Sequence, residues 1–215
     1  MSDVLFVIRQ CGNQHCRFRF PAPVDQVVQA HCPKCGHLLE QVGQSYANSS
    51  IQPASIIDHK VPVSILLDNV RSALNVGSII RTAEGIGVEH IHLCGITATP
   101  DNPKVGKTAL RAEATLQWSY HLNALDTALK LKKEGVQIWS LELTSRSIPV
   151  HEAIKHRSDK PILLVAGNEQ AGVDPDILSA SDRLIYLPMY GSKTSINIAV
   201  AVGIAASMLF NPSCV

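Results

Sequence analysis

The sequence predicts an α/β domain built on a parallel sheet with helices on both faces, preceded by a small cysteine-rich domain. Three observations support this prediction. Strand-like and helix-like segments alternate between residues 61 and 210. Four of the six cysteines fall between Cys11 and Cys35. Hydrophobic residues make up 46% of the 215 residues, which is enough to bury a sizeable core and argues against intrinsic disorder.

The charge balance excludes a strongly basic nucleic-acid-binding protein. The chain carries 19 Lys and Arg against 18 Asp and Glu, a net charge of +1, so any site for a polyanion must be a local patch. The N-terminus has no basic segment followed by a long apolar run, as a signal peptide would. The longest apolar stretch, Ile196 to Phe210, is too short to span a bilayer and contains polar residues. We therefore expect a cytoplasmic protein without a membrane partner, in which cysteines stay reduced.

The four clustered cysteines follow the pattern C-x4-C-x15-C-x2-C. Zinc takes four thiolates at the corners of a tetrahedron, and two tight turns that each offer two thiolates meet that requirement. We expect Cys11, Cys16, Cys32 and Cys35 to hold a structural zinc ion in a ribbon-like domain over residues 1–42, which is too small to fold alone. A thioredoxin-like redox pair of Cys32 and Cys35 is the weaker alternative, because it leaves the first two cysteines unexplained.

The same small domain combines basic and aromatic side chains. Two interpretations remain open: they form a surface that binds nucleic acid through charge and stacking, or they are exposed charges beside a small core. These residues are Arg9, Arg17, Arg19, Lys34, Phe18 and Phe20. Residues 43–60 are rich in Gln, Ser, Asn and Gly and are predicted to be a linker.

The larger domain is predicted to span residues 61–215. Its strands are indicated by short apolar runs, and its helices by amphipathic spacing, glycine stops and polar caps. We predict a long irregular connection over 95–118 and a buried final helix from about residue 195 to 210. The strands are expected at 63–68, 90–94, 136–143, 161–167 and 183–188, and the other helices at 75–87, 123–135 and 174–181.

No nucleotide-binding loop is found in the sequence. Gly106, Lys107 and Thr108 resemble the end of a phosphate-binding P-loop, but the glycine required earlier in that loop is replaced by Asp101. No G-x-G-x-x-G follows a strand either, so nothing favours ATP, GTP or NAD as a ligand.

Three polar segments follow predicted strands, at the edge of the sheet where open α/β folds bind ligands. In the first, Asn75 is a candidate helix cap, and Arg81 is either half-buried against an anionic partner or extends its head into water. In the third, Ser195 is a candidate cap for the final helix, which leaves Asn197 unexplained. The segments span residues 69–81, 167–172 and 187–197.

The three segments contain N-x-G-x-x-x-R from Asn75, G-N-E-x-x-G from Gly167, and P-M-x-G-x-K-x-S-I-N from Pro188. Together and in this order, they resemble the three motifs of the SpoU (TrmH-type) branch of the SPOUT RNA methyltransferases, over residues 61–215. The sequence departs from the family pattern at Arg111, where we expect glycine. It also departs in its cysteine-rich N-terminal domain, which is not the family's usual RNA-binding extension.

This resemblance implies that the parallel-sheet domain contains a deep trefoil knot. It also implies a homodimer packed through the helices of the knot, with the active site at the interface. S-adenosylmethionine (AdoMet) is then expected to bind bent in the knot loops, largely through the backbone around Leu141, Gly167, Leu187 and Ile196.

The implied reaction is methyl transfer to a ribose 2′-oxygen of tRNA or rRNA, with no DNA substrate and no catalytic metal. The resemblance assigns the catalytic centre to Asn75, Arg81, Glu169, Ser195 and Asn197. Because a guanidinium has a pKa above about 12, we expect Arg81 to grip a phosphate or the developing oxyanion, and Glu169 to orient Arg81 or Asn75. The alternatives are a non-catalytic RNA- or ribosome-binding protein with the same fold, and methylation of a base.

Overall fold

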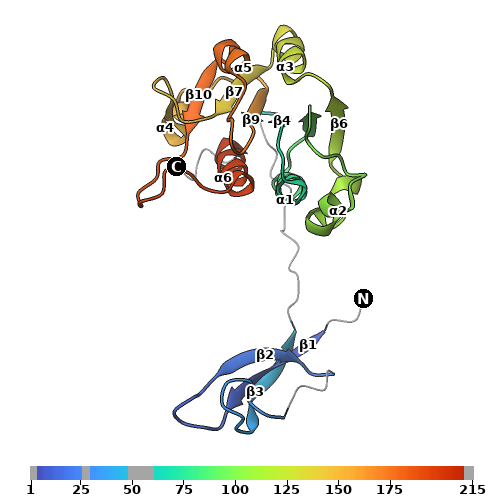
Figure 1. Cartoon of the computed structure of the whole chain (residues 1–215), viewed down its shortest axis with the longest axis vertical. Helices are drawn as coiled ribbons and strands as arrows, with labels where there is room; N and C mark the ends of the chain where they lie inside the picture. The colour runs from blue at the N-terminus through green and yellow to red at the C-terminus, as the bar shows by residue number, and fades with distance from the viewer. Residues whose placement is uncertain (1–3, 26–29, 48–60, 211–215) are drawn as a thin grey trace. The chain divides into compact units, whose positions relative to one another are not determined.

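The computed structural model describes residues 4–25, 30–47 and 61–210. The chain divides into two compact units, Met1–Ile57 and Asp58–Val215 (Figure 1). The predicted end of the cysteine-rich domain at residue 42 falls inside a strand that continues to Ala47. The rest of the predicted linker, residues 48–60, lies outside the described residues.

The N-terminal unit is a three-stranded antiparallel sheet. Its central strand β1 (Leu5–Cys11) pairs with β2 (Arg19–Pro23) on one side and with β3 (Leu39–Ala47) on the other. Its buried hydrophobic residues in the described part are Val7, Cys11, Ala22 and Cys32. A core of this size cannot stabilise a domain without further help.

The C-terminal unit contains a seven-stranded sheet in which every neighbouring pair of strands is parallel, as predicted. The strand order is β6-β5-β4-β9-β7-β10-β8. Its strands are β4 (Val63–Asp68), β5 (His90–Cys94), β6 (Gln117–His121), β7 (Gln137–Leu141), β8 (Ile148–Pro149), β9 (Ile162–Ala166) and β10 (Arg183–Tyr186).

Helices cover both faces of this sheet, which confirms the predicted fold class (Figure 1). Alternate side chains of β4 enter different cores: Ile65 and Leu67 pack on one face, and Leu66 packs on the other. This two-sided burial explains why the strand is a continuous apolar run. The first face is covered by α1 (Ala73–Ile86), α2 (Pro103–Ala109), α4 (Val150–Lys155) and α6 (Ile198–Phe210), and the second by α3 (Ala124–Lys133) and α5 (Pro175–Ala180). Among the described residues, no helix combines the length and apolar character that crossing a membrane requires.

Helix α1 begins differently from the prediction. Ser72 is its N-cap, and the Ser72 side chain accepts a hydrogen bond from the Asn75 N–H at 3.3 Å. Asn75 therefore lies in the first turn and does not cap the helix. Its side-chain amide remains available for contacts with other segments.

The connection over 95–118 is less irregular than predicted. It contains α2, a short 3₁₀ helix (Ala112–Ala114) and the first residues of edge strand β6. The start of α2 carries a recognisable signal, because Asn102 caps it and Pro103 occupies its first position. The short elements β8 and α4 were also absent from the prediction, and neither is long enough to show a clear period.

Arg111, which stands where we expect glycine, has a backbone φ of +75°. This left-handed conformation is costly for a residue with a Cβ atom and free of that cost for glycine. We expect Arg111→Gly to raise the free energy of unfolding of the C-terminal unit by about 1 kcal/mol, as measured by urea denaturation. Arg146→Gly is the matched control, because its φ is not positive; we expect it to be neutral or destabilising. A lower stability of Arg111→Gly than of the wild type would contradict this account.

Candidate functional site

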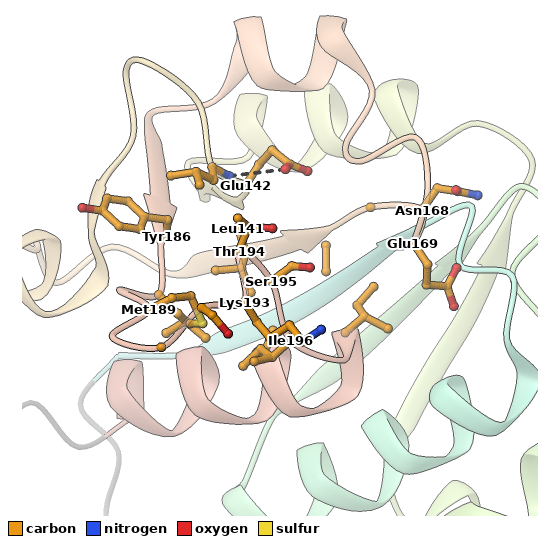
Figure 2. Close-up of a pocket in the computed structure, with 18 residues that line it drawn as sticks. Leu141, Glu142, Asn168, Glu169, Tyr186, Met189, Lys193, Thr194, Ser195 and Ile196 are labelled. Atoms are coloured by element: carbon orange, nitrogen blue, oxygen red, sulfur yellow. Dashed lines mark hydrogen bonds between the residues drawn. The ribbon is translucent and has the colours of Figure 1, made fainter.

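A cavity of about 480 Å³ lies where the loops after β7, β9 and β10 meet the start of α6 (Figure 2). These loops leave the carboxyl ends of parallel strands, the edge at which this fold class binds ligands. Its lining combines apolar side chains with two carboxylates, Glu142 and Glu169. The size of the cavity is within the range of small-molecule sites.

All four residues predicted to bind the cofactor line this cavity: Leu141, Gly167, Leu187 and Ile196. Ser195 lines it as well (Figure 2). The structure therefore brings these residues together from three separate loops. Their roles in binding stay predictions.

Gly167 occupies a position that admits no side chain. A Cβ atom there would lie 2.2 Å from the Gly172 carbonyl oxygen. The two strands of this tight loop are joined by reciprocal backbone hydrogen bonds of 2.9 Å between Asn168 and Gly172. The Asn168 side chain also donates to the Asn69 carbonyl at 2.8 Å, which ties the loop to the end of β4. The cavity wall at Gly167 is consequently bare backbone held in place from both sides.

Three residues predicted to be catalytic form one hydrogen-bonded chain. The Glu169 carboxylate accepts from the Asn75 Nδ2 at 3.1 Å, and the Asn75 Oδ1 accepts from the Asn197 Nδ2 at 3.1 Å. The Asn197 Oδ1 in turn accepts from the Ala199 N–H at 2.8 Å, so Asn197, and not Ser195, caps α6. An ionised carboxylate only accepts and a backbone N–H only donates, so the two ends of the chain fix the orientation of both amides.

Glu169 is an acceptor that positions its neighbours. Partial burial acts to raise the pKa of its carboxyl, but the N–H groups of Arg71 and Ser72 and the Asn75 amide bond to it, and the pKa is lowered overall. The group is therefore a carboxylate at neutral pH and has no proton to give. Of the two partners considered from the sequence, it bonds to Asn75 and not to Arg81.

Arg81 lies in a different hollow, of about 450 Å³, between α1 and α2. Its side chain is exposed and has no hydrogen-bond or ion-pair partner among the described residues, as is also true of Lys107 in the same hollow. Arg81 is therefore exposed and not half-buried, and no described residue of the protein is its anionic partner. An RNA phosphate as that partner stays a prediction. The hollow is lined by Ser78, Arg81, Thr82, Lys107, Thr108 and Leu110.

Gly77 explains how α2 comes so close to α1. A Cβ atom at Gly77 would lie 2.2 Å from both the Thr108 Oγ1 and the Val105 carbonyl oxygen. The Thr108 hydroxyl also donates to the Leu74 carbonyl at 2.9 Å. This close packing brings Lys107 to the same hollow as Arg81.

Comparison with known proteins agrees with this arrangement. Residues 62–207 match the SpoU rRNA Methylase family, which is most of the chain and includes every element that forms the two hollows.

The chain belongs to the SpoU rRNA methylase family.

Named relatives match about two thirds of the chain. The chain is 32% identical over 147 residues to a tRNA (guanosine(18)-2′-O)-methyltransferase of Aquifex aeolicus, covering 65% of this chain and 64% of that protein. It is 34% identical over 145 residues to a 23S rRNA (guanosine(2553)-2′-O)-methyltransferase of Bacillus subtilis, covering 65% and 54%. The chain thus spans between about half and two thirds of the length of these relatives.

Two solved structures share the fold of the C-terminal unit. An AdoMet-bound rRNA methyltransferase from Sinorhizobium meliloti has a TM-score of 0.64 and 26% identity, covering 72% of this chain and 57% of the other. The A. aeolicus TrmH/SpoU tRNA modifying enzyme has a TM-score of 0.62 and 27% identity, covering 72% and 77%.

Glu142 is a cavity residue of the SpoU domain that the sequence analysis missed. The predicted strand extended to residue 143, whereas β7 ends at Leu141, so Glu142 belongs to the exit loop. Glu142 lines the cavity. Its carboxylate accepts from the Val173 N–H at 3.1 Å and from the Leu143 N–H at 3.3 Å, the dashed line in Figure 2. The sequence did contain a sign of this role, because Glu142 is a charged residue directly after a buried strand, like the polar residues of the three motif segments.

The four clustered cysteines of the N-terminal unit converge on one point. Their Sγ atoms all lie within 4.8 Å of one another, with Cys11 and Cys35 at 3.4 Å and Cys16 and Cys32 at 3.8 Å. Tetrahedral geometry with Zn–S bonds of about 2.3 Å requires sulfur atoms about 3.8 Å apart. The donor set and its spacing therefore fit zinc.

Left-handed residues shape both cysteine turns. Arg17 follows Cys16 with φ +48°, and Gly36 follows Cys35 with φ +72°. The Lys34 N–H points to the Cys32 Sγ at 3.4 Å, as amides do in thiolate sites. The two turns thus present their sulfur atoms in the same way.

Proposed function

We propose that this protein is an AdoMet-dependent RNA methyltransferase that modifies a ribose 2′-hydroxyl of tRNA or rRNA. The chain of hydrogen bonds from Glu169 through Asn75 to Asn197 carries this proposal. It joins the three motif segments beside a cavity suited to a small molecule. The names of the relatives, which methylate guanosine 2′-hydroxyls in tRNA or 23S rRNA, support the same reaction class.

The cavity residues fit AdoMet. Apolar walls formed by Leu141, Leu187 and Ile196 suit an adenine ring, and the carboxylates of Glu142 and Glu169 suit a ligand with a cationic centre. When bound, AdoMet supplies a methyl group on a sulfonium, which is already a good electrophile. The bare backbone at Gly167 allows a ligand to approach the main chain closely.

The protein's part in the reaction is to position the ribose 2′-hydroxyl of the RNA and to stabilise the negative charge that develops on its oxygen. A guanidinium is a poor proton acceptor, so we assign Arg81 to an RNA phosphate or the oxyanion, with the proton leaving through that phosphate or water. Asn75 and Asn197 present oriented amides at the meeting point of the loops. Ser195 lines the adjoining cavity.

The proposal extends to a homodimer packed through α6. A homodimer would cover apolar side chains that α6 leaves exposed, such as Val200 at 52% and Ile204 at 42%. The family resemblance also supports a trefoil knot around the cavity loops. Because the proposed substrates are tRNA and rRNA, the cytoplasm remains the expected location.

The decisive experiment is transfer of labelled methyl groups from AdoMet to total RNA from a strain that lacks the gene. We expect label in RNA and, after digestion to nucleosides, in a 2′-O-methylribose. Label found in a base would show that the protein methylates a base and not the ribose. If the full chain neither transfers label nor binds AdoMet by calorimetry, the alternative of a non-catalytic RNA- or ribosome-binding protein replaces the proposal.

We also propose that Cys11, Cys16, Cys32 and Cys35 hold one structural zinc ion. The convergence of four thiols in a unit with a very small core supports this assignment.

Removing a zinc ligand is expected to release the metal. After dialysis of the full chain against EDTA, the wild type should retain about one zinc per chain, and Cys32→Ser should retain almost none. We expect the amide signals of residues 4–47 to lose their dispersion in Cys32→Ser while those of the SpoU domain persist. His37→Gln is the control, since His37 lies beside the cluster and outside it. Equal zinc in wild type and Cys32→Ser would refute the assignment.

A further inference from the structure

A second cluster of metal-ligating side chains lies in the SpoU domain, on strands β5 and β6. His90 and His92 come from β5, and Ser119 and His121 come from β6. The two strands pair in parallel, with His92 opposite Ser119 and Cys94 opposite His121. Because alternate residues of a strand point to the same face, all four side chains share one face of the sheet.

One nitrogen of each imidazole ring lies close to the Ser119 hydroxyl. The Ser119 Oγ lies 2.7 Å from the His90 Nε2, 3.3 Å from the His92 Nδ1 and 2.8 Å from the His121 Nε2. The His92 Nδ1 and His121 Nε2 are themselves only 3.2 Å apart. Two nitrogens bound to one tetrahedral ion at about 2.0–2.1 Å are about 3.3 Å apart, so these two are already at the separation of paired ligands.

The surroundings leave the ring nitrogens able to bind a cation. The rings are partly accessible. The cluster contributes to neither of the two hollows of the proposed methyltransferase site.

The rings also contact one another. Their centroids are 4.4 Å (His90 and His92) and 5.3 Å (His92 and His121) apart. The Ser119 hydroxyl, with one proton and two lone pairs, can bond to all three rings while no cation is bound. Three imidazoles around one point are also a donor set that suits borderline transition metals.

We propose that His90, His92 and His121 bind one divalent first-row transition-metal ion, of the class of Zn²⁺ or Ni²⁺. His90 reaches the other two rings through the Ser119 hydroxyl. The metal-bound form therefore requires Ser119 to rotate out from between the rings. This site is independent of the four cysteines and of the methyl-transfer reaction.

The test is calorimetric titration of Ni²⁺ into the full chain already loaded with zinc at the cysteines. We expect one further ion to bind, with the affinity reduced at least about tenfold in His92→Gln and in His121→Gln. Paramagnetic broadening by Ni²⁺ should reach the imidazole signals of all three histidines. The affinity should also fall as the pH is lowered, because protons compete for the same nitrogens.

Two controls separate binding from folding. His156→Gln, at the end of α4 and outside the cluster, should titrate like the wild type. Ser119→Ala removes the hydroxyl without removing a ligand, and should retain the ion. The proposal is overturned if no ion binds beyond the zinc, or if His92→Gln and His121→Gln lower only the melting temperature and leave the titration unchanged, since the cluster is then purely structural.

Discussion

Replacing Arg81 by alanine is expected to reduce methyl transfer to RNA by about 100- to 1000-fold, the usual effect of removing one charge-stabilising donor. Arg81 extends into a hollow with another free cation, Lys107, and with hydroxyls from α1 and α2. We expect an RNA phosphate or a developing oxyanion to pair with Arg81. The affinity for AdoMet should stay unchanged, because the hollow shares no lining residue with the cavity of about 480 Å³.

Single-turnover methylation and calorimetry with AdoMet measure the two effects separately. Arg146→Ala is the matched control, because Arg146 is an exposed arginine of the same unit that lines neither hollow. Methyl transfer that persists in Arg81→Ala would remove Arg81 from the catalytic centre. A parallel loss of AdoMet affinity would instead place it at the cofactor.

Replacing Glu169 by glutamine is expected to reduce methyl transfer by about 100-fold, even though the two side chains have nearly the same shape. Every partner of Glu169 is a donor: the Arg71 N–H, the Ser72 N–H and the Asn75 Nδ2. A glutamine turns one oxygen into an NH₂ group, which must face a donor. The glutamine therefore gives up either the bond to the Arg71 N–H or the bonds to the Ser72 N–H and Asn75, and the segment that presents Asn75 to Asn197 is held less firmly.

The matched control is Glu134→Gln, at the exposed end of α3. Asn75→Asp provides an independent check, since it sets two carboxylates against each other and should be as damaging as Glu169→Gln. Both variants are compared with the wild type by methylation rate and by thermal unfolding, which separates a local effect from a loss of the fold. A Glu169→Gln enzyme with the wild-type rate would show that the network does not position the reaction.

The fold was predictable because its signals are local. Buried strands such as 63–68 are continuous apolar runs, and their alternation with helices indicates a parallel sheet. The prediction failed where elements are short or lie at an edge, as with α2, β6, β8 and α4. In these segments tertiary contacts decide the structure, as when Gly77 allows α2 to pack on α1.

The candidate site was predictable in its residues and unpredictable in its connections. The motifs point to Asn75, Glu169 and Asn197, but the hydrogen bonds among them link positions far apart in the sequence. Asn197 directly precedes the apolar run of α6, a position typical of an N-cap, but no local pattern tells that Arg81 lines a different hollow from Glu169. The histidine cluster is similar, because only the register of β5 against β6 brings its rings together.

The hydrogen bond between Asn75 and Asn197 also bears on how the protein is made. Asn75 and Asn197 are separated by more than half of the polypeptide. During synthesis on the ribosome, most of the sheet strands are therefore made before Asn197 is. Closing so long a loop is a late and slow event. Products that terminate before Asn197 are thus expected to lack this bond, and with it the proposed methyl-transfer activity, even when partly folded.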